Sequence, residues 1–318
     1  MIKNIILAKI FPQDVHMCTI ILCFVILVLF ITNNSVVISG ASCGLMLWYN
    51  NVVPVLLPFM LLSNIMVSRT GRHTNKTSYA IIITLFLGIF CGYPLGAKTA
   101  SDFVKRGNIS KLTGNILIPL CNNSSPMFIA GYIVHILLND QITFPFAMLA
   151  IYIPYLTFVV LALLIYKIIQ DKYTKYYNGI SVKFHRHIKH SPENISASNE
   201  PDIIMDSVTQ ITYVGIYIMI CSIIIEFIKY IPGLPLDKLA LLSGITEITN
   251  GTHIVSTCNV FSEQIKTALV MAFTSFGGIS AILQTNKVIS HSGLSILSYI
   301  IIKTICAVGT FYITLLLI

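Results

Sequence analysis

The stretch GIFCGYPLGAKTASDFVKRGNISKLTGNILIPLCNNSSPMFIA, residues 88–130, decides the fold of this chain. It is largely apolar, but the segments GYPLGAK at 92–98 and NNSSP at 122–126 interrupt it. Lipid offers no hydrogen bonds to backbone groups, so an irregular backbone at membrane depth must be buried in protein or line a watery cavity. Two such interruptions close together are typical of the binding site of a membrane transporter.

The composition places the chain in a lipid bilayer. Of its 318 residues, 55% are hydrophobic and only 10% are charged, against about 25% charged residues in a soluble domain. The net charge of +8 comes largely from basic residues in short loops between apolar runs. That pattern is typical of topology signals and not of a nucleic-acid surface. We therefore expect an all-α polytopic membrane protein whose partner is the bilayer and which binds no nucleic acid.

Motifs for metals, cofactors and catalysis are missing from the sequence. The eight cysteines are scattered without a CxxC pair, and the eight histidines form no HExxH. There is no P-loop, dinucleotide fingerprint or hydrolase elbow, and no nucleophile and base share a helix face. We expect no metal, no cofactor and no enzymatic activity, so transport would be gradient-driven or passive.

The apolar runs divide the chain into two similar halves. Each half contains two short apolar arms joined at a break, and each arm falls below the ~20 residues of a span. Re-entrant hairpins are the economical interpretation. Two full spans joined by a tight turn are the alternative, because they would leave the orientation of all the other spans unchanged. The predicted organisation is an N-terminal span and interfacial helix (1–51), a first repeat (52–169; hairpin about 78–104, broken helix 112–138), a cytoplasmic polar loop (170–205) and a second repeat (206–318; hairpin about 236–258, broken helix 265–283).

The two repeats are expected to have opposite orientations. A shift of 155 residues superposes Gly96 on Gly251 and Asn122 on Gly277. Each repeat holds three full spans, an odd number, so the second is inserted upside down relative to the first. With a cytoplasmic N-terminus, fifteen of the 20 basic residues lie inside and two, Lys98 and Lys303, lie in the membrane, as the positive-inside rule requires. The apolar run 17–31 is taken as a retained span, with a signal peptide as the alternative.

The first hairpin and broken helix supply candidate substrate contacts. Lys98 follows the hairpin tip, marked by Gly92, Pro94 and Gly96, and an ionisable residue inside a membrane segment suggests function. The alternatives for Lys98 are a structural bridge to Asp102 on the same helical face, or snorkelling to the interface. At the helix break, four polar side chains could contact substrate or cap the two half-helices: Asn122, Asn123, Ser124 and Ser125. Pro126 follows them, at the start of the second half-helix, where proline is tolerated.

The second hairpin and broken helix supply the matching set. Candidate substrate contacts at the hairpin turn are Glu247, Thr249 and Asn250, flanked by Gly244 and Gly251. The carboxylate suits a coupling cation or a proton, or could balance Lys98; a polar surface loop is the alternative. At the second helix break, Ser275 is a candidate contact, and Gly277 and Gly278 mark the break or serve close helix packing. Lys303, a lone charge in the last span, is expected to pair within the bundle.

Several of these segments together resemble the YlbJ, or SpoVV, family of sporulation integral membrane proteins. They follow in order from about residue 40 to 310: GLMLWYNNVVPVLLPF (44–59), GYPLGAK (92–98), CNNSSPMFIAG (121–131), EITNG (247–251) and SFGG (275–278). The resemblance implies a pair of nucleoside-recognition, or gate, domains similar to part of the concentrative nucleoside transporters. It also implies a role in endospore formation, moving dipicolinic acid from the mother cell across the outer forespore membrane. No binding residues are carried over from the family.

We therefore expect a secondary carrier of a small organic anion, with dipicolinate as the first candidate. A nucleoside or other small-metabolite carrier is the alternative in the same class, and a non-transporting scaffold for sporulation is the alternative in another. The expected location is the mother-cell-derived outer forespore membrane. A coupling ion, calcium co-transport and homo-oligomerisation stay open.

Overall fold

The computed structural model describes residues 2–70, 77–177 and 200–318, and every regular element in these ranges is a helix. The all-helical class expected from composition is therefore confirmed for this part of the chain. Residues 71–76, in a short basic segment between apolar runs, and residues 178–199 of the predicted polar loop at 170–205 lie outside the described residues. The flanks of the polar loop, 170–177 and 200–205, are helical, so this part of the loop prediction is wrong.

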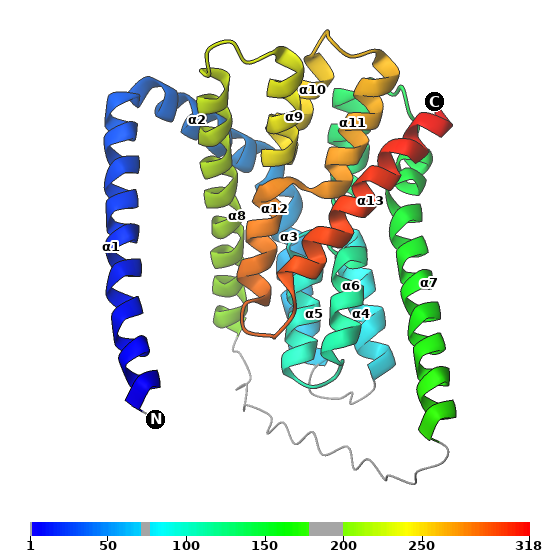
Figure 1. Cartoon of the computed structure of the whole chain (residues 1–318). Helices are drawn as coiled ribbons and strands as arrows, with labels where there is room; N and C mark the ends of the chain where they lie inside the picture. The colour runs from blue at the N-terminus through cyan, green and yellow to red at the C-terminus, as the bar shows by residue number, and fades with distance from the viewer. Residues whose placement is uncertain (1, 71–76, 178–199) are drawn as a thin grey trace.

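The chain begins with a helix that stands at the side of the bundle (Figure 1). This helix, α1 (Ile2–Thr32), contains the predicted first span and meets the next helix, α2 (Asn34–Leu47), at a bend of 97°. A π-helical turn, η1 (Trp48–Val52), then joins α2 to α3 (Val53–Thr70).

The predicted interfacial helix is packed against the protein. A methyl group added to Gly40 or Gly44 would lie 2.6 and 2.7 Å from α-carbons of α8 (Glu200–Lys229). Small residues four apart let two helix backbones approach this closely. The position of α2 relative to lipid stays a prediction.

The first half continues with two antiparallel helices and a broken one. The paired helices, α4 (Thr77–Cys91) and α5 (Leu95–Lys105), occupy the stretch predicted as the first hairpin. They are followed by α6 (Lys111–Cys121), a break at 122–125, and a helix that resumes at Pro126 and becomes η2 (Phe128–Leu137). The half closes with α7 (Phe144–Tyr177).

The second half has the same order of elements. After α8 come the antiparallel pair α9 (Leu236–Thr246) and α10 (Ile248–Thr257), then α11 (Glu263–Phe276), α12 (Gly278–Ile289) and α13 (Ile296–Leu317). The segment predicted as a broken helix ending at 283 continues to Ile289, because α12 keeps burying one face, including Gln284, Thr285 and Ile289. Figure 1 shows α4 and α5 at one end of the molecule and α9 and α10 at the opposite end.

Each antiparallel pair is closed by glycine facing glycine. A methyl group on Gly96 would lie 3.0 Å from the α-carbon of Gly88, and one on Gly251 would lie 2.5 Å from that of Gly244. Two helices can meet at such distances only where neither carries a side chain. The two hairpins therefore use the same packing device: Gly96 and Gly251 are related by the shift of 155 residues seen in the sequence, and their partners Gly88 and Gly244 differ from it by one residue.

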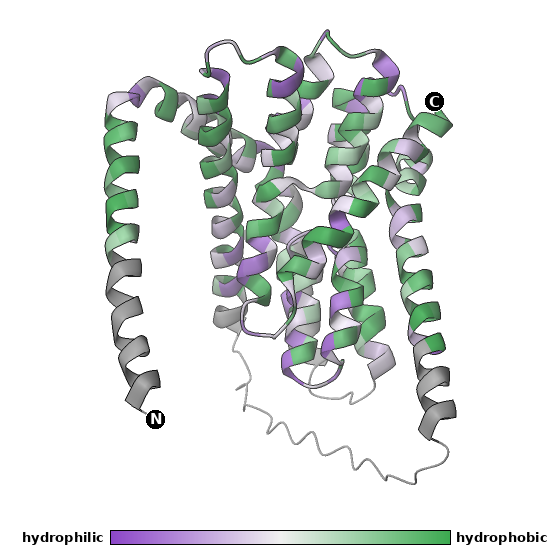
Figure 2. Ribbon diagram, viewed as in Figure 1, coloured by the Kyte–Doolittle hydropathy of each residue, from purple (hydrophilic) through white to green (hydrophobic). Residues whose placement is uncertain are grey.

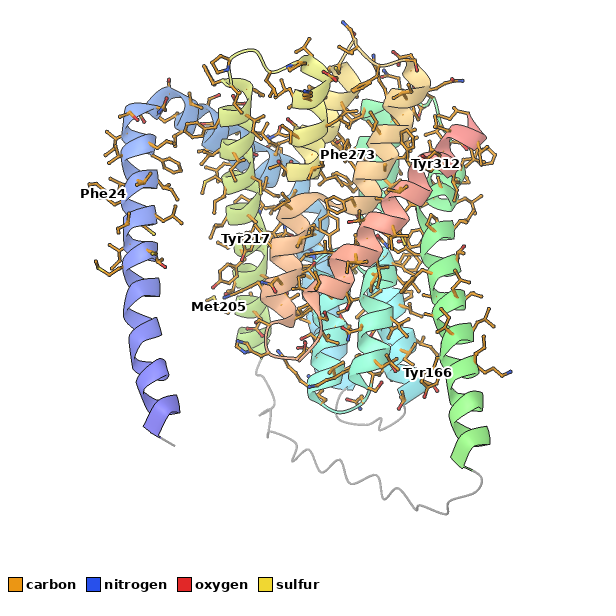
Figure 3. The ribbon with its side chains drawn as sticks, in the orientation of Figure 1. Phe24, Tyr166, Met205, Tyr217, Phe273 and Tyr312 are labelled. Atoms are coloured by element: carbon orange, nitrogen blue, oxygen red, sulfur yellow. The ribbon has the colours of Figure 1, made fainter. Side chains whose placement is uncertain are left out.

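The outer surface is apolar along the long helices, as Figure 2 shows for α1 and α7. Four helices are long and apolar enough to cross a membrane, or five if the bent pair of α1 and α2 is one span. Figure 3 labels three large side chains on outer helices that are at least half exposed, Phe24, Tyr166 and Tyr312. So much exposed apolar surface requires a lipid environment.

Candidate functional site

The tip of each hairpin rests on the helix break of its own half. A methyl group on Gly92 would lie 2.7 Å from Ser125 N and 2.9 Å from Asn123 O, and the backbone N–H of Tyr93 donates to Asn123 O at 2.9 Å. In the second half, a methyl group on Gly278 would lie 3.1 Å from Thr246 O. Glycine is needed at these positions both for the close approach and for the positive φ of Gly92 (78°) and Gly278 (76°).

The two halves also touch each other at these breaks. Ser124 Oγ, in the first break, donates to Thr274 O at the end of α11 at 3.2 Å. The Tyr93 ring lies 3.9 Å from a methyl group placed on Gly277 in the second break. Two hairpin tips and two helix breaks thus share one centre, although they are far apart in sequence.

The asparagines of the first break hold it in place. Asn122 donates to Thr285 Oγ1 at 2.8 Å and to Tyr299 OH at 3.0 Å, and it accepts the backbone N–H of Ala97 at 3.3 Å. Asn123 donates to the carbonyls of Pro119 and Leu120 at 3.2 and 2.9 Å. Both amides cap exposed backbone or join neighbouring helices, which is the structural alternative to substrate contact.

Lys303 is a central residue that sequence reasoning left outside the site. It is 0% exposed, and its Nζ donates to Asn123 Oδ1 at 2.7 Å and to Asn122 O at 3.3 Å. The ammonium also lies 5.2 and 5.9 Å from the ring centres of Tyr155 and Tyr299, within range of cation–π attraction. It forms no ion pair with any described carboxylate. Its one signal in the sequence was being a lone charge in an apolar span.

The second break is held in a complementary way. Tyr155 OH, from α7, donates to Ser275 O at 2.8 Å, and Thr310 Oγ1, from α13, donates to Ser275 Oγ at 3.1 Å. The last helix of the first half therefore supports the second break, while the last helix of the second half supports the first through Lys303. Ser275 is fully buried and serves this support.

A small cavity of about 40 Å³ lies between the breaks. That is room for a few water molecules. Its polar lining combines predicted residues with others that the sequence did not single out: Ser124, Ser125, Glu247, Thr249 and Gly277 from the predicted set, and Asn51, Tyr93, Ser280 and Gln284 besides.

Glu247 is the one charged residue of this lining. Its side chain is 1% exposed, so the surface-loop alternative is wrong. Its Oε2 accepts the backbone N–H of Asn250 at 2.8 Å, which caps the N-terminus of α10. The neighbouring candidate Asn250 points elsewhere, since it donates to Ser222 Oγ on α8 at 2.9 Å and accepts from Cys43 Sγ at 3.4 Å.

Lys98 lies away from the cavity lining. Its Nζ donates to Asn64 Oδ1 on α3 at 2.8 Å, and Asn64 in turn donates to Ser207 Oγ on α8 at 2.7 Å. The structural bridge to Asp102, one of the alternatives for Lys98, does not form, although both residues are described. Lys98 therefore ties α5 to α3 and, through Asn64, to α8.

The remaining predicted break residues have local backbone roles. Pro94 precedes the first turn of α5, Pro126 opens the helix that becomes η2, and Ser125 Oγ accepts the N–H of Phe128 at 3.3 Å. Gly277 ends α11 in a left-handed conformation with φ of 86°.

Comparison with known proteins gives one informative relative. The chain is 25% identical over 295 residues to the sporulation integral membrane protein YlbJ of Bacillus subtilis (strain 168), covering 80% of this chain and 71% of that protein. No family model matches the chain, and no solved structure matches it. The similarity supports the resemblance seen in the sequence, whereas the nucleoside-recognition domains stay a prediction. The chain is an integral, multi-pass membrane protein, similar over most of its length to a sporulation membrane protein.

Proposed function

We propose that this protein is a secondary carrier of a small organic anion. The observation that carries the proposal is the meeting of two hairpin tips and two helix breaks around a cavity with one buried carboxylate. Discontinuous helices facing each other at the centre of a membrane protein are the usual construction of a transport site. A scaffold would have no need of buried polar groups at these four points.

The same geometry favours two inverted repeats with re-entrant hairpins. The hairpins lie at opposite ends of the molecule (Figure 1), each is closed by a glycine pair, and each rests on the break of its own half. Arms of 15, 11, 11 and 10 residues are short for a span of about 20. The end that carries α4 and α5 also carries Lys105 at the end of α5 and Lys111 at the start of α6, so the positive-inside rule assigns this end to the cytoplasm.

The described conformation is closed. Its cavity is far smaller than the roughly 300–1,000 Å³ of small-molecule sites. Admission of substrate therefore requires the hairpin tips to withdraw from the breaks, loosening the contacts of Gly92 with Ser125 and of Gly278 with Thr246. Withdrawal at one end at a time would give alternating access.

An anion is the favoured substrate because Lys303 is a buried lysine without a carboxylate partner among the described residues, and it contacts the first break just outside the cavity lining. An ionisable residue at this depth of a membrane protein usually serves function. The half-helices that begin at α5, η2, α10 and α12 add positive dipole ends near the centre. Dipicolinate, a planar dianion, is the first candidate through the family resemblance described for the sequence, and the outer forespore membrane is the corresponding location. The relative itself supports a role in sporulation.

The test is uptake of radiolabelled dipicolinate by proteoliposomes that contain the purified protein, with uridine as a parallel substrate. We expect saturable dipicolinate uptake that is lost in Lys303→Met and kept in the matched control Lys238→Met, whose side chain is exposed. Gel filtration in detergent checks that both variants stay folded. Uridine uptake would indicate a nucleoside carrier instead, and the absence of both under every ion gradient would favour the scaffold.

A further inference from the structure

We propose that the central cavity binds a monovalent cation of the size of sodium, with Glu247 as its charged ligand. This inference rests on the proposed function, because the cation would accompany the anion through the membrane. The site lies at the junction of the two halves, where Tyr93, Ser124 and Gly277 also line the cavity.

The burial of the Glu247 carboxyl group is the first observation. The side chain is 1% exposed and forms no ion pair with any described lysine, arginine or histidine. An ionised carboxylate in this position is costly unless a positive charge accompanies it. Lys303 does not supply that charge, since its Nζ contacts Asn122, Asn123 and two tyrosine rings instead.

An unpartnered oxygen is the second and independent observation. Gln284 is 3% exposed and lines the cavity. Its Nε2 donates to Ser280 Oγ at 3.1 Å, while its Oε1 has no hydrogen-bond partner. A buried acceptor without a donor is destabilising, and a bound cation would satisfy it.

The rest of the lining fits a hard cation. Ser124, Ser125 and Thr249, which carry hydroxyl groups, line the same space, and such ions prefer oxygen ligands. One carboxylate among neutral oxygens suits a single positive charge. The described residues contain no cluster of three or more histidine, cysteine, aspartate or glutamate side chains that would hold a divalent metal.

The location explains how a cation would couple to transport. Glu247 belongs to the second hairpin tip, Ser124 to the first break and Gln284 to the half-helix after the second break. A cation that binds all three favours the closed conformation over any in which these elements separate. A ligand shifts a conformational equilibrium through such differential binding.

The single tryptophan gives a direct reporter. Trp48 Nε1 donates to Ile211 O at 2.9 Å, and its ring packs on Gly215. Val214 and Ile218, on the same stretch of α8, line the cavity. Binding in the cavity should therefore alter Trp48 fluorescence in the full-length protein in detergent.

The experiment titrates NaCl against choline chloride at constant ionic strength, following Trp48 fluorescence and the melting temperature. We expect a saturable fluorescence change and a rise in melting temperature with sodium, as for any ligand of the folded state. Glu247→Gln should weaken the apparent affinity at least tenfold, and Gln284→Leu severalfold. The matched control Glu263→Gln, at a surface carboxylate, should behave as wild type.

Two results would overturn the proposal. The first is a folded wild-type protein in which neither signal responds to sodium. The second is a response to pH alone that Glu247→Gln removes, which would identify a proton site; Tyr93, Tyr132 and Cys221 are the titratable groups near this carboxylate. If the first result is accompanied by dipicolinate uptake, the carrier is kept and only the cation site is refuted, whereas sodium binding without uptake would keep the site and refute the carrier.

Discussion

The closest backbone contact of the first hairpin gives a sharp test of the whole arrangement. A methyl group on Gly96 would lie 2.0 Å from the carbonyl oxygen of Cys121 and 2.7 Å from its carbonyl carbon. Ordinary van der Waals contact begins near 3.4 Å, so Gly96→Ala forces the hairpin and α6 apart by about 1.4 Å. Both partners are backbone, so no side chain can swing away.

The expected cost follows from this displacement. Overpacking of a well-packed interior costs about 1–3 kcal/mol. The displacement also stretches two bonds that seat the hairpin on the break, from Ala97 N to Asn122 Oδ1 and from Tyr93 N to Asn123 O, each worth roughly 0.5–1.5 kcal/mol. The better helix propensity of alanine offsets about 1 kcal/mol of this cost, which leaves a net loss of about 1–5 kcal/mol.

The assay is the apparent melting temperature in detergent, followed by dipicolinate uptake in proteoliposomes. Gly96→Ala should melt well below wild type and transport poorly. Gly251→Ala should behave alike, because its methyl group would lie 2.3 Å from Ser243 O in the second hairpin. The matched control is Gly131→Ala, a helical position with no atom within 4 Å of the added methyl group. Equal melting temperatures for Gly96→Ala and Gly131→Ala would refute the close approach of hairpin and break.

Three further substitutions test single contacts. Lys98→Met removes the donor to Asn64 Oδ1. It should lower the free energy of unfolding by about 1–2 kcal/mol and change the KM for uptake less than twofold. A tenfold rise in KM would instead place Lys98 in the anion site. Tyr155→Phe removes the hydroxyl that donates to the buried Ser275 O. It should lower the free energy of unfolding by about 1–2 kcal/mol, measured as a lower melting temperature. An unchanged melting temperature would contradict the supporting role assigned to α7. Gly277→Ala places a side chain at φ of 86°, which should cost about 1–2 kcal/mol in thermal denaturation, whereas Gly277→Asn should be better tolerated.

Local features of the sequence located the breaks well. Glycine, proline and adjacent asparagines interrupt apolar runs at 92–94, 122–126 and 277–278, and the helices end and begin at these points. Three glycines that were also expected to mark hairpin tips lie instead inside helices, where they allow close packing: Gly96, Gly244 and Gly251. Such interruptions act on the backbone of their own segment, so they can be recognised without knowledge of the neighbours. The membrane class and the helical class follow equally from composition.

The role of individual polar residues could not be recognised in this way. Lys98 follows a break and looked like a substrate contact, but it faces Asn64 on another helix. Lys303 and Gln284 lie in helices without any local motif, yet one supports the first break and the other lines the cavity. Which way a polar side chain of a membrane helix points depends on how that helix is rotated against its neighbours.

The sequence by itself thus determined that this protein is helical, spans the membrane and carries two pairs of interrupted segments. Those properties depend on hydrophobicity and on the conformational preferences of single residues. The tertiary structure alone decided that the four interruptions meet, that Lys303 rather than Lys98 contacts the first break, and that Glu247 and Gln284 share a cavity. The reason is physical: these relations join residues more than 30 positions apart, and helix packing, not local preference, fixes them.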